Sequence, residues 1–104
     1  MQADLFDLNL ATLEREAGQQ RAAAHRAALL AKARALAVQV AQQRRDRTVT
    51  ADDVYRLLPP ADIHHLGNAA GSLFRGAAWE FTGRRTRSRR ITNHAREIKV
   101  WRLR

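Results

Sequence analysis

The run from Ala17 to Gln43 constrains the fold more than any other part of the chain. It holds eleven alanines and no proline. Alanine has the highest helix propensity, because its side chain loses no rotational freedom in a helix, so this run predicts one long helix. Apolar residues recur within it at steps of four, three and four, which predicts a buried stripe made of Leu29, Ala33, Leu36 and Val40.

The predicted helix is too long to be covered along its whole length. The chain has 104 residues, which support a single hydrophobic core. At about 1.5 Å per residue the helix measures roughly 40 Å, more than the width of such a domain. We therefore expect a domain over residues 17–104, from which residues 17–28 project. A lead-in segment over residues 1–16, which mixes acidic and apolar side chains, is expected to precede it.

Two further helices are predicted on either side of a proline pair. Thr48-Val49 is expected to be extended, and Thr50 followed three residues later by Asp53 is typical of a reciprocally capped helix start. Pro59-Pro60 ends this helix, because a proline ring excludes the preceding residue from helical geometry. Asp62 is expected to cap the next helix. The apolar residues assigned to the two helices are Val54, Leu57 and Leu58, then Ile63, Leu66, Ala70, Leu73 and Phe74.

The end of the chain predicts two strands. Residues 79–82 alternate apolar and polar side chains, and residues 97–103 mix apolar with basic ones. The stretch 83–96 between them carries six arginines and no acidic residue, and it is too long for a tight turn. A hairpin with an extended basic loop is therefore expected.

Positive charge is concentrated in the same region. Residues 1–80 hold ten basic and nine acidic side chains, whereas residues 81–104 hold nine basic and one acidic. Eight of these nine are arginines, whose planar guanidinium groups bind phosphate through two parallel hydrogen bonds. The charge favours a polyanionic partner, and the alternative is a basic segment that is merely solvated.

The order of these elements is typical of a winged helix-turn-helix, a mainly α (α+β) fold. Here it would carry a long N-terminal alanine-rich helix and a C-terminal two-stranded wing. The third helix of such a unit enters the major groove of DNA, and the wing lies along the phosphate backbone or probes the minor groove. The third helix would supply the readout residues His65, Asn68, Ser72 and Arg75, unless they form an ordinary solvated face. The wing would supply Arg84, Arg85, Arg87, Arg89, Arg90 and Arg96.

Two other patterns each allow two interpretations. Gly67 and Gly71 lie one turn apart in the third helix, which predicts either close packing of the second helix or close approach of the DNA backbone. Trp79, Phe81 and Trp101 either anchor the hairpin to the helices or stack on unpaired bases. In the second case the chain would bind RNA or single-stranded DNA.

No enzymatic or cofactor site is predicted. The chain has no cysteine, which excludes disulfides, thiolate zinc sites and cysteine nucleophiles. His64 and His65 point to different sides of a helix and do not chelate one metal ion together, and the acidic residues form no nuclease-like cluster. We expect a non-enzymatic protein without metal or cofactor. No signal peptide or long apolar run is found, which predicts a cytoplasmic location without membrane contact.

Four short stretches between Thr48 and Trp101 carry a family likeness. They read VTADDV at 49–54, LGNAAGSLFR at 66–75, WEFTG at 79–83 and IKVW at 98–101. Together they resemble small winged-helix proteins of bacteriophages and prophages. The resemblance implies binding of duplex DNA in replication or transcriptional control, inside a bacterial host cell.

The N-terminal stretch Gln2-Ala3-Asp4-Leu5-Phe6 resembles the bacterial sliding-clamp binding peptide, although Ala3 stands where that family usually has Leu. In the family, the Gln hydrogen-bonds at the rim of a pocket and the Leu-Phe pair fills an apolar groove. The resemblance implies that Gln2, Leu5 and Phe6 contact the clamp and that the chain is a replication adaptor. The alternative is that Leu5 and Phe6 pack on the domain.

A weak homodimer is also expected. The small side chains of residues 22–28 let two helices approach closely, but they contribute little apolar area. Because association itself costs several kcal/mol, we expect a dimer that DNA binding strengthens.

Overall fold

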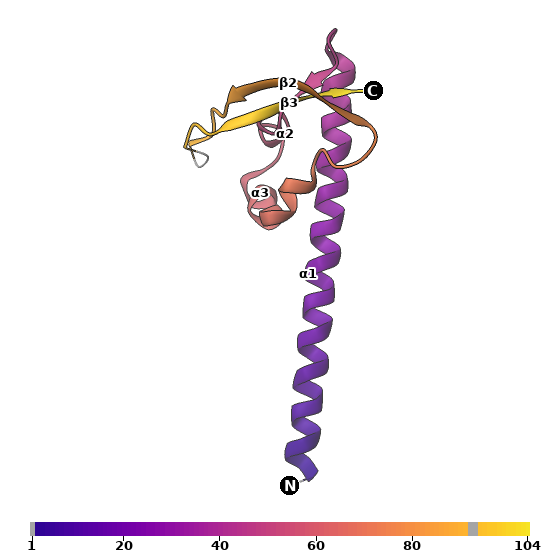
Figure 1. The fold of residues 1–104 in the computed structure, drawn as a ribbon. Coiled ribbons are helices and arrows are strands. Elements are labelled where there is room, and N and C mark those ends of the chain that lie inside the picture. The colour runs from indigo at the N-terminus through magenta and orange to yellow at the C-terminus, as the bar shows by residue number, and fades with distance from the viewer. Residues whose placement is uncertain (1, 92–93) are drawn as a thin grey trace.

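A long helix and a small mixed domain make up the computed structural model (Figure 1). The structure describes the backbone of residues 2–91 and 94–104, and the side chains of residues 9–67, 71–91 and 94–104. Helix α1 spans Gln2–Gln43. Two short helices and a three-stranded antiparallel sheet pack against its C-terminal half, so the fold is mixed helix and sheet.

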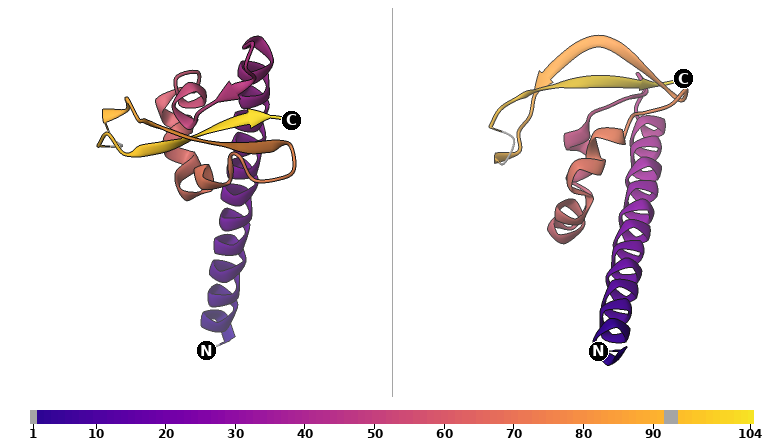
Figure 2. Two further views of the ribbon diagram at one scale, coloured as in Figure 1. Left: turned by 45° about the horizontal axis from the view of Figure 1, so that its top comes forward. Right: turned by 60° about the horizontal axis from the view of Figure 1, so that its bottom comes forward.

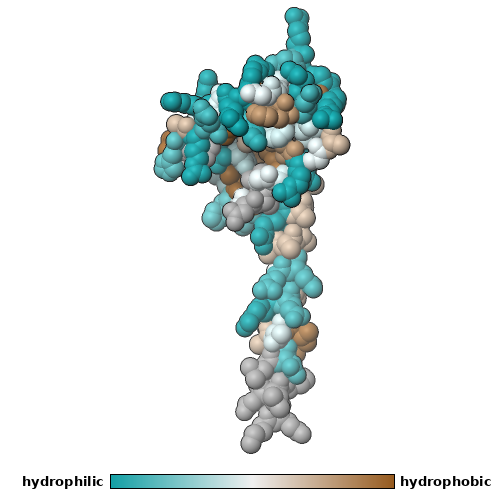
Figure 3. All heavy atoms as spheres, in the orientation of Figure 1, coloured by the Kyte–Doolittle hydropathy of each residue, from teal (hydrophilic) through white to brown (hydrophobic). Residues whose placement is uncertain are grey.

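Helix α1 begins well before the predicted first residue, Ala17. Residues 2–16, expected to be a lead-in segment, are the first turns of the same helix. They contain no glycine or proline that would interrupt it. Side chains from residue 9 to residue 28 are exposed or half-buried, and Figure 3 shows this part of the helix extending away from the rest of the molecule.

The buried face of α1 is narrower than its apolar stripe predicts. Leu29, Ala33, Ala37 and Ala41 are buried at four-residue steps, whereas Leu36 and Val40 are half-buried at the margins. Alanine has a single methyl group as its side chain, so it lets neighbouring elements approach the helix backbone closely. The predicted stripe is therefore confirmed in part: Leu29 and Ala33 are buried, and Leu36 and Val40 pack against the edge of the core.

The start of the second helix is confirmed. Strand β1 spans Thr48–Val49 and helix α2 spans Ala51–Tyr55. Thr50 caps α2: its hydroxyl accepts a hydrogen bond from the Asp53 amide at 3.4 Å, and its own amide donates to the Asp53 carboxylate at 2.8 Å. The predicted buried edge needs one correction, because Leu57 is 54% exposed. Its place in the core is taken by Tyr55.

The third helix is shorter than predicted and is not one continuous helix. Helix α3 spans Pro60–Leu66, with Pro59 rather than Asp62 at the N-cap, and a 3-10 helix, η1, follows over Gly67–Ser72. The break lies at Gly67, whose φ of +49° is rare for residues with a side chain. A Cβ atom at Gly67 or Gly71 would meet no heavy atom of the described residues within 4 Å, so close packing against these residues does not explain either glycine.

The sheet has the strand order β1-β3-β2. Strand β2 spans Trp79–Arg87 and β3 spans Glu97–Leu103. Because β2 continues to Arg87, the connecting loop covers residues 88–96, not the predicted 83–96. The register of the β2–β3 pairing shifts between Phe81 and Arg85, where Gly83 has a φ of +82°. Such a bulge changes the direction of the second half of β2.

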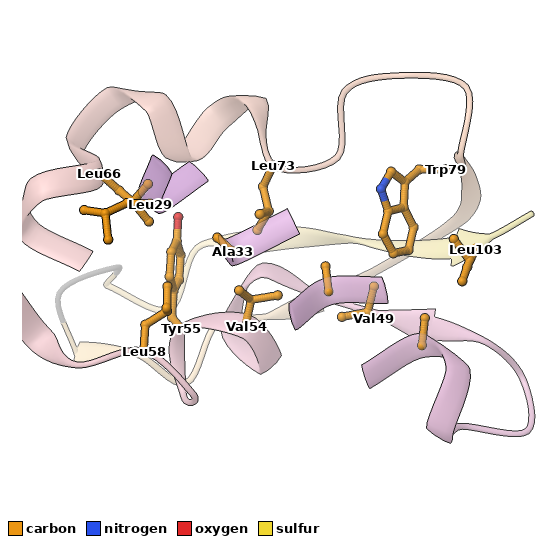
Figure 4. Packing of buried hydrophobic residues seen from close by; sticks show 12 residues of the cluster. Leu29, Ala33, Val49, Val54, Tyr55, Leu58, Leu66, Leu73, Trp79 and Leu103 are labelled. Carbon is orange, nitrogen blue, oxygen red and sulfur yellow. The ribbon is translucent and has the colours of Figure 1, made fainter. Parts of the chain in front are cut away.

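The core lies between α1, the two short helices and the sheet, as Figure 4 shows for Leu29, Val54, Leu66 and Leu103. The aromatic rings hold the hairpin to this core. Phe74 stacks on Trp101 with ring centroids 5.6 Å apart and meets the edge of Trp79 at 5.1 Å. Anchoring of the hairpin, one of the two interpretations of these tryptophans, is therefore observed. Figure 2 gives two further views of the hairpin, the short helices and the projecting part of α1.

Candidate anion-binding groove

A groove of about 400 Å³ lies between the hairpin and the start of α2. We call it the arginine groove. The segment from the end of α1 through α2 contributes Arg44, Asp46, Thr48, Thr50, Asp52, Asp53 and Arg56. The hairpin contributes Arg84, Thr86, Arg87, Arg89, Ile98 and Val100.

One arginine of the groove, Arg44, is bound to a carboxylate within the chain. Two nitrogens of the Arg44 guanidinium donate to the two carboxylate oxygens of Asp53, at 2.8 and 3.1 Å. This hydrogen bonding raises the pKa of Arg44. Burial alone would raise the pKa of Asp53, but hydrogen bonds from Arg44 and Thr50 outweigh it and hold that pKa below its usual value. The pair ties the end of α1 to the cap of α2.

Four other arginines keep their donors available. Arg56, Arg84, Arg87 and Arg89 are exposed. Within the part of the chain that the structure describes, their guanidinium groups make no hydrogen bond or ion pair. Each offers five N–H donors in a planar fork, which matches the oxygens of a phosphate. The groove can therefore bind the phosphates of a polyanion.

Asp46 at the rim of the groove is held as an anion. Its carboxylate accepts hydrogen bonds from the Thr48 hydroxyl at 2.9 Å and the Thr48 amide at 3.2 Å. These hydrogen bonds, with a smaller contribution from the charge of Arg84, lower the pKa of Asp46. Asp46 therefore places a negative charge at the rim of the groove, where it attracts the guanidinium of Arg84.

The buried carboxylate of Asp52 fixes the hairpin beside the groove. The Ser88 hydroxyl lies 2.8 and 3.0 Å from its two oxygens, and the Arg89 amide donates to it at 2.7 Å. Ser88 is buried as well. The loop after β2 is thus attached to the first turn of α2, and this attachment places Arg87 and Arg89 in the groove wall.

The six predicted wing arginines do not form one surface. Arg84, Arg87 and Arg89 line the arginine groove. The guanidinium carbon of Arg90 lies 4.0 Å from the centre of the Tyr55 ring, and Arg85 lies 5.7 Å from the centre of Phe81, outside the groove.

Arg96 and Tyr55 take part in the contacts that position the loop between β2 and β3. Arg96 is exposed in the loop, and its carbonyl accepts a hydrogen bond from the Ser88 amide at 2.8 Å. Burial raises the pKa of Tyr55, while the charge of Arg90 opposes this rise. Arg90 therefore serves to hold the loop against α2.

The four predicted readout residues are not brought together on one helix face, because α3 ends at Leu66. The His65 ring meets the edge of His25 on α1 at 5.2 Å. The Ser72 carbonyl accepts a hydrogen bond from Arg34 at 2.8 Å, and Arg75 is exposed beyond η1. The side chain of Asn68 lies outside the described residues. The predicted continuous helix that would carry these four residues is therefore wrong, whereas their contact with DNA stays a prediction.

The predicted clamp contacts Gln2, Leu5 and Phe6 belong to the first turns of α1, and their side chains lie outside the described residues. In the described part of the chain, no group of three or more His, Cys, Asp or Glu residues is arranged to hold a metal ion. Nor does any helix in that part have both the length and the apolar character needed to cross a membrane.

Sequence reasoning missed two contributors to the groove. Arg56 lies just after α2, outside the basic C-terminal region, and no periodicity marks it. Asp52 lies in the first turn of α2, where an acidic residue is common, and nothing local marks it as the buried acceptor that holds the hairpin. An acidic residue before the predicted capping partner, combined with an arginine-rich loop lacking acids, is the only signal that the sequence offers for this link.

Comparisons with protein-family models, curated proteins and solved structures find no match to this chain.

Proposed function

We propose that this chain is a non-enzymatic protein of winged-helix type that binds duplex DNA. The order helix, strand, helix, helix, strand, strand supports the fold assignment, as does the sheet order β1-β3-β2. Both are typical of winged helices. The short α3 and the 3-10 helix after it depart from the usual long recognition helix.

The observation that carries the proposal is the set of four guanidinium groups in the arginine groove that have no hydrogen bond or ion pair to any described residue. They come from the hairpin and from the end of α2, so the groove offers donors from both walls. Arginine binds phosphate oxygens without reading the base sequence. The proposed binding is therefore mainly to the DNA backbone, and it tolerates different sequences.

Backbone binding of this kind predicts a strong dependence on salt. Each neutralised phosphate releases condensed counterions, so log affinity falls with log salt at a slope of about −0.9 per phosphate contacted. Four contacts from the groove would give a slope of roughly −3.6. Contacts from Asn68 or Arg75 to base edges would add sequence preference, and this readout stays a prediction.

The test is a binding titration by fluorescence anisotropy over a series of salt concentrations, using duplex DNA, single-stranded DNA and RNA of the same sequence. The variant Arg84→Ala, Arg87→Ala and Arg89→Ala is expected to flatten the slope on duplex DNA by about three units. The matched control changes Arg15, Arg21 and Arg26 to Ala, which removes the same charge from the projecting part of α1. If both variants flattened the slope equally, net charge alone would explain the binding and the groove would have no special role.

Preference for single strands or RNA over duplex would overturn the proposal in favour of the stacking alternative. Cleavage of any substrate in the presence of Mg²⁺ would overturn the non-enzymatic part. We further propose, from the family resemblance, a role of phage type in replication or transcriptional control. Clamp binding through Gln2, Leu5 and Phe6 would favour replication, and titration of the chain with a bacterial sliding clamp tests it.

A further inference from the structure

Ile91 is the most exposed large apolar side chain in the described part of the chain. It is 93% exposed and lies in the loop between β2 and β3. The amide of His94 donates to the Ile91 carbonyl at 3.2 Å. An isoleucine in this position gains nothing from the fold, because its whole side chain stays in water.

The loop just before Ile91 is held in place. The Ser88 hydroxyl donates to the buried Asp52 carboxylate and accepts a hydrogen bond from the Arg90 amide at 3.3 Å. The guanidinium of Arg90 packs on the Tyr55 ring. These contacts keep Ile91 directed away from the core, and they reduce the ordering that a partner would have to impose on the loop.

The loop that carries Ile91 is cationic. Residues 88–96 include three arginines and no acidic residue. A single apolar side chain among positive charges fits a polyanion that also offers a narrow apolar slot. The stacked base pairs of duplex DNA are such a partner, because proteins that bind the minor groove insert single apolar side chains, isoleucine among them, between base steps.

We propose that Ile91 acts as a wedge that enters between two base pairs from the minor groove and kinks the duplex; this inference rests on the proposed DNA binding. Pyrimidine-purine steps such as TpA unstack most easily, so the wedge selects sites that contain them. An anionic membrane is the less suitable partner. Stable insertion into lipid requires an extended apolar face, whereas this loop presents one isoleucine.

The experiment compares wild-type protein with Ile91→Ala on two short duplexes, one with a central TpA step and one with an uninterrupted A-tract. The adenine of the TpA step is replaced by 2-aminopurine, whose fluorescence rises when it unstacks, and the duplex ends carry a donor and an acceptor dye. Leu57→Ala is the matched control, because Leu57 is also an exposed apolar residue and belongs to the segment after α2, not to the loop.

The wild type and the Leu57→Ala variant are expected to raise 2-aminopurine fluorescence and energy transfer, and to bind the TpA duplex about tenfold more tightly than the A-tract. Ile91→Ala is expected to lose all three effects while binding the A-tract unchanged. Equal bending by wild type and Ile91→Ala overturns the wedge and leaves the proposed DNA binding intact. Failure to bind either duplex overturns both.

A third arm uses vesicles of phosphatidylglycerol. If Ile91→Ala weakens sedimentation with these vesicles and leaves binding and bending of both duplexes unchanged, the wedge is overturned in favour of a lipid contact.

Discussion

The two halves of α1 are both rich in alanine, but they have different surroundings. Residues 9–28 are rich in alanine and stay exposed or half-buried, whereas four residues between 29 and 41 are buried at regular steps. Alanine content explains why both halves are helical. It does not determine which half is covered, because burial depends on where the sheet and the short helices pack. Helix formation and core formation are thus separate properties of this helix.

The largest expected difference between the halves comes from leucine truncation. Leu29→Ala removes a buried side chain and leaves a cavity, so it should lower the free energy of unfolding by about 2–5 kcal/mol. Leu13 is 60% exposed, and Leu13→Ala should change that free energy by less than about 0.5 kcal/mol. Urea denaturation followed by circular dichroism measures both. Similar losses would mean that the N-terminal half is covered in solution.

Replacement of an alanine by leucine gives a second comparison of the stability of the two halves. Ala37 is fully buried, so Ala37→Leu should force neighbouring side chains apart and cost about 1–3 kcal/mol. The same change at the exposed Ala24 should leave stability nearly unchanged, because leucine and alanine both favour helices. Thermal unfolding of the two variants tests this. A destabilised Ala24→Leu variant would contradict the assignment of a free projecting half.

A smaller effect is expected from pH, through the ion pair at the end of α1. The pKa of Asp53 lies below its ordinary value of 3.8 in the folded chain, so its carboxylate stabilises the fold above that pH. This stabilisation should be lost as the pH falls from 3.8 through the lower folded pKa. Asp53→Asn should flatten the pH dependence there and cost about 0.5–2 kcal/mol at neutral pH through the weakened cap.

The control for this measurement is Glu14→Gln in the projecting half. In the described part of the chain Glu14 makes no ion pair, so its change should leave stability at neutral pH within about 0.5 kcal/mol. If Asp53→Asn kept the acid dependence of the wild type, another carboxylate would have to be responsible.

Self-association is the smallest effect expected. We propose that the exposed half of α1 pairs weakly with a second copy, with a dissociation constant of about 100 μM or weaker, because its small side chains bury little apolar area. Ala24→Glu should abolish this pairing with little change in stability, because Ala24 is exposed in the proposed contact over residues 22–28, and binding to a duplex should strengthen pairing in the wild type. Light scattering over a concentration series detects it. A strict monomer at every concentration, free and on DNA, would contradict the proposal.

The local part of the fold could be predicted from the sequence. The long helix, the cap at Thr50, the break at Pro59-Pro60 and the hairpin all follow from interactions within a few residues. The break at Gly67 could not be predicted, because two glycines inside an apolar helical pattern fit either a costly helix or an interrupted one. Here the positive φ of Gly67 decides for the interruption.

The candidate site was harder to predict, because its geometry depends on contacts between distant residues. The arginine content of the sequence located the cationic region. It did not show which arginines line the groove and which pack on aromatic rings. Asp52 and Ser88 are 36 residues apart, and their hydrogen bond selects which arginines line the groove. The packing of Arg90 on Tyr55 likewise joins two segments that no local pattern connects. Charge runs therefore indicate a class of partner, while the binding surface itself is set by tertiary contacts.

The projecting half of α1 affects how this protein moves through solution. The Cα atoms span 67 Å along the long axis and 28 and 22 Å across it. A molecule with these proportions has a larger frictional coefficient than a sphere of the same mass. It should therefore leave a size-exclusion column early, at the volume of a heavier compact protein, and its rotational diffusion should be slower about the short axes than about the long one. Elution position alone would thus report a monomer as a larger species.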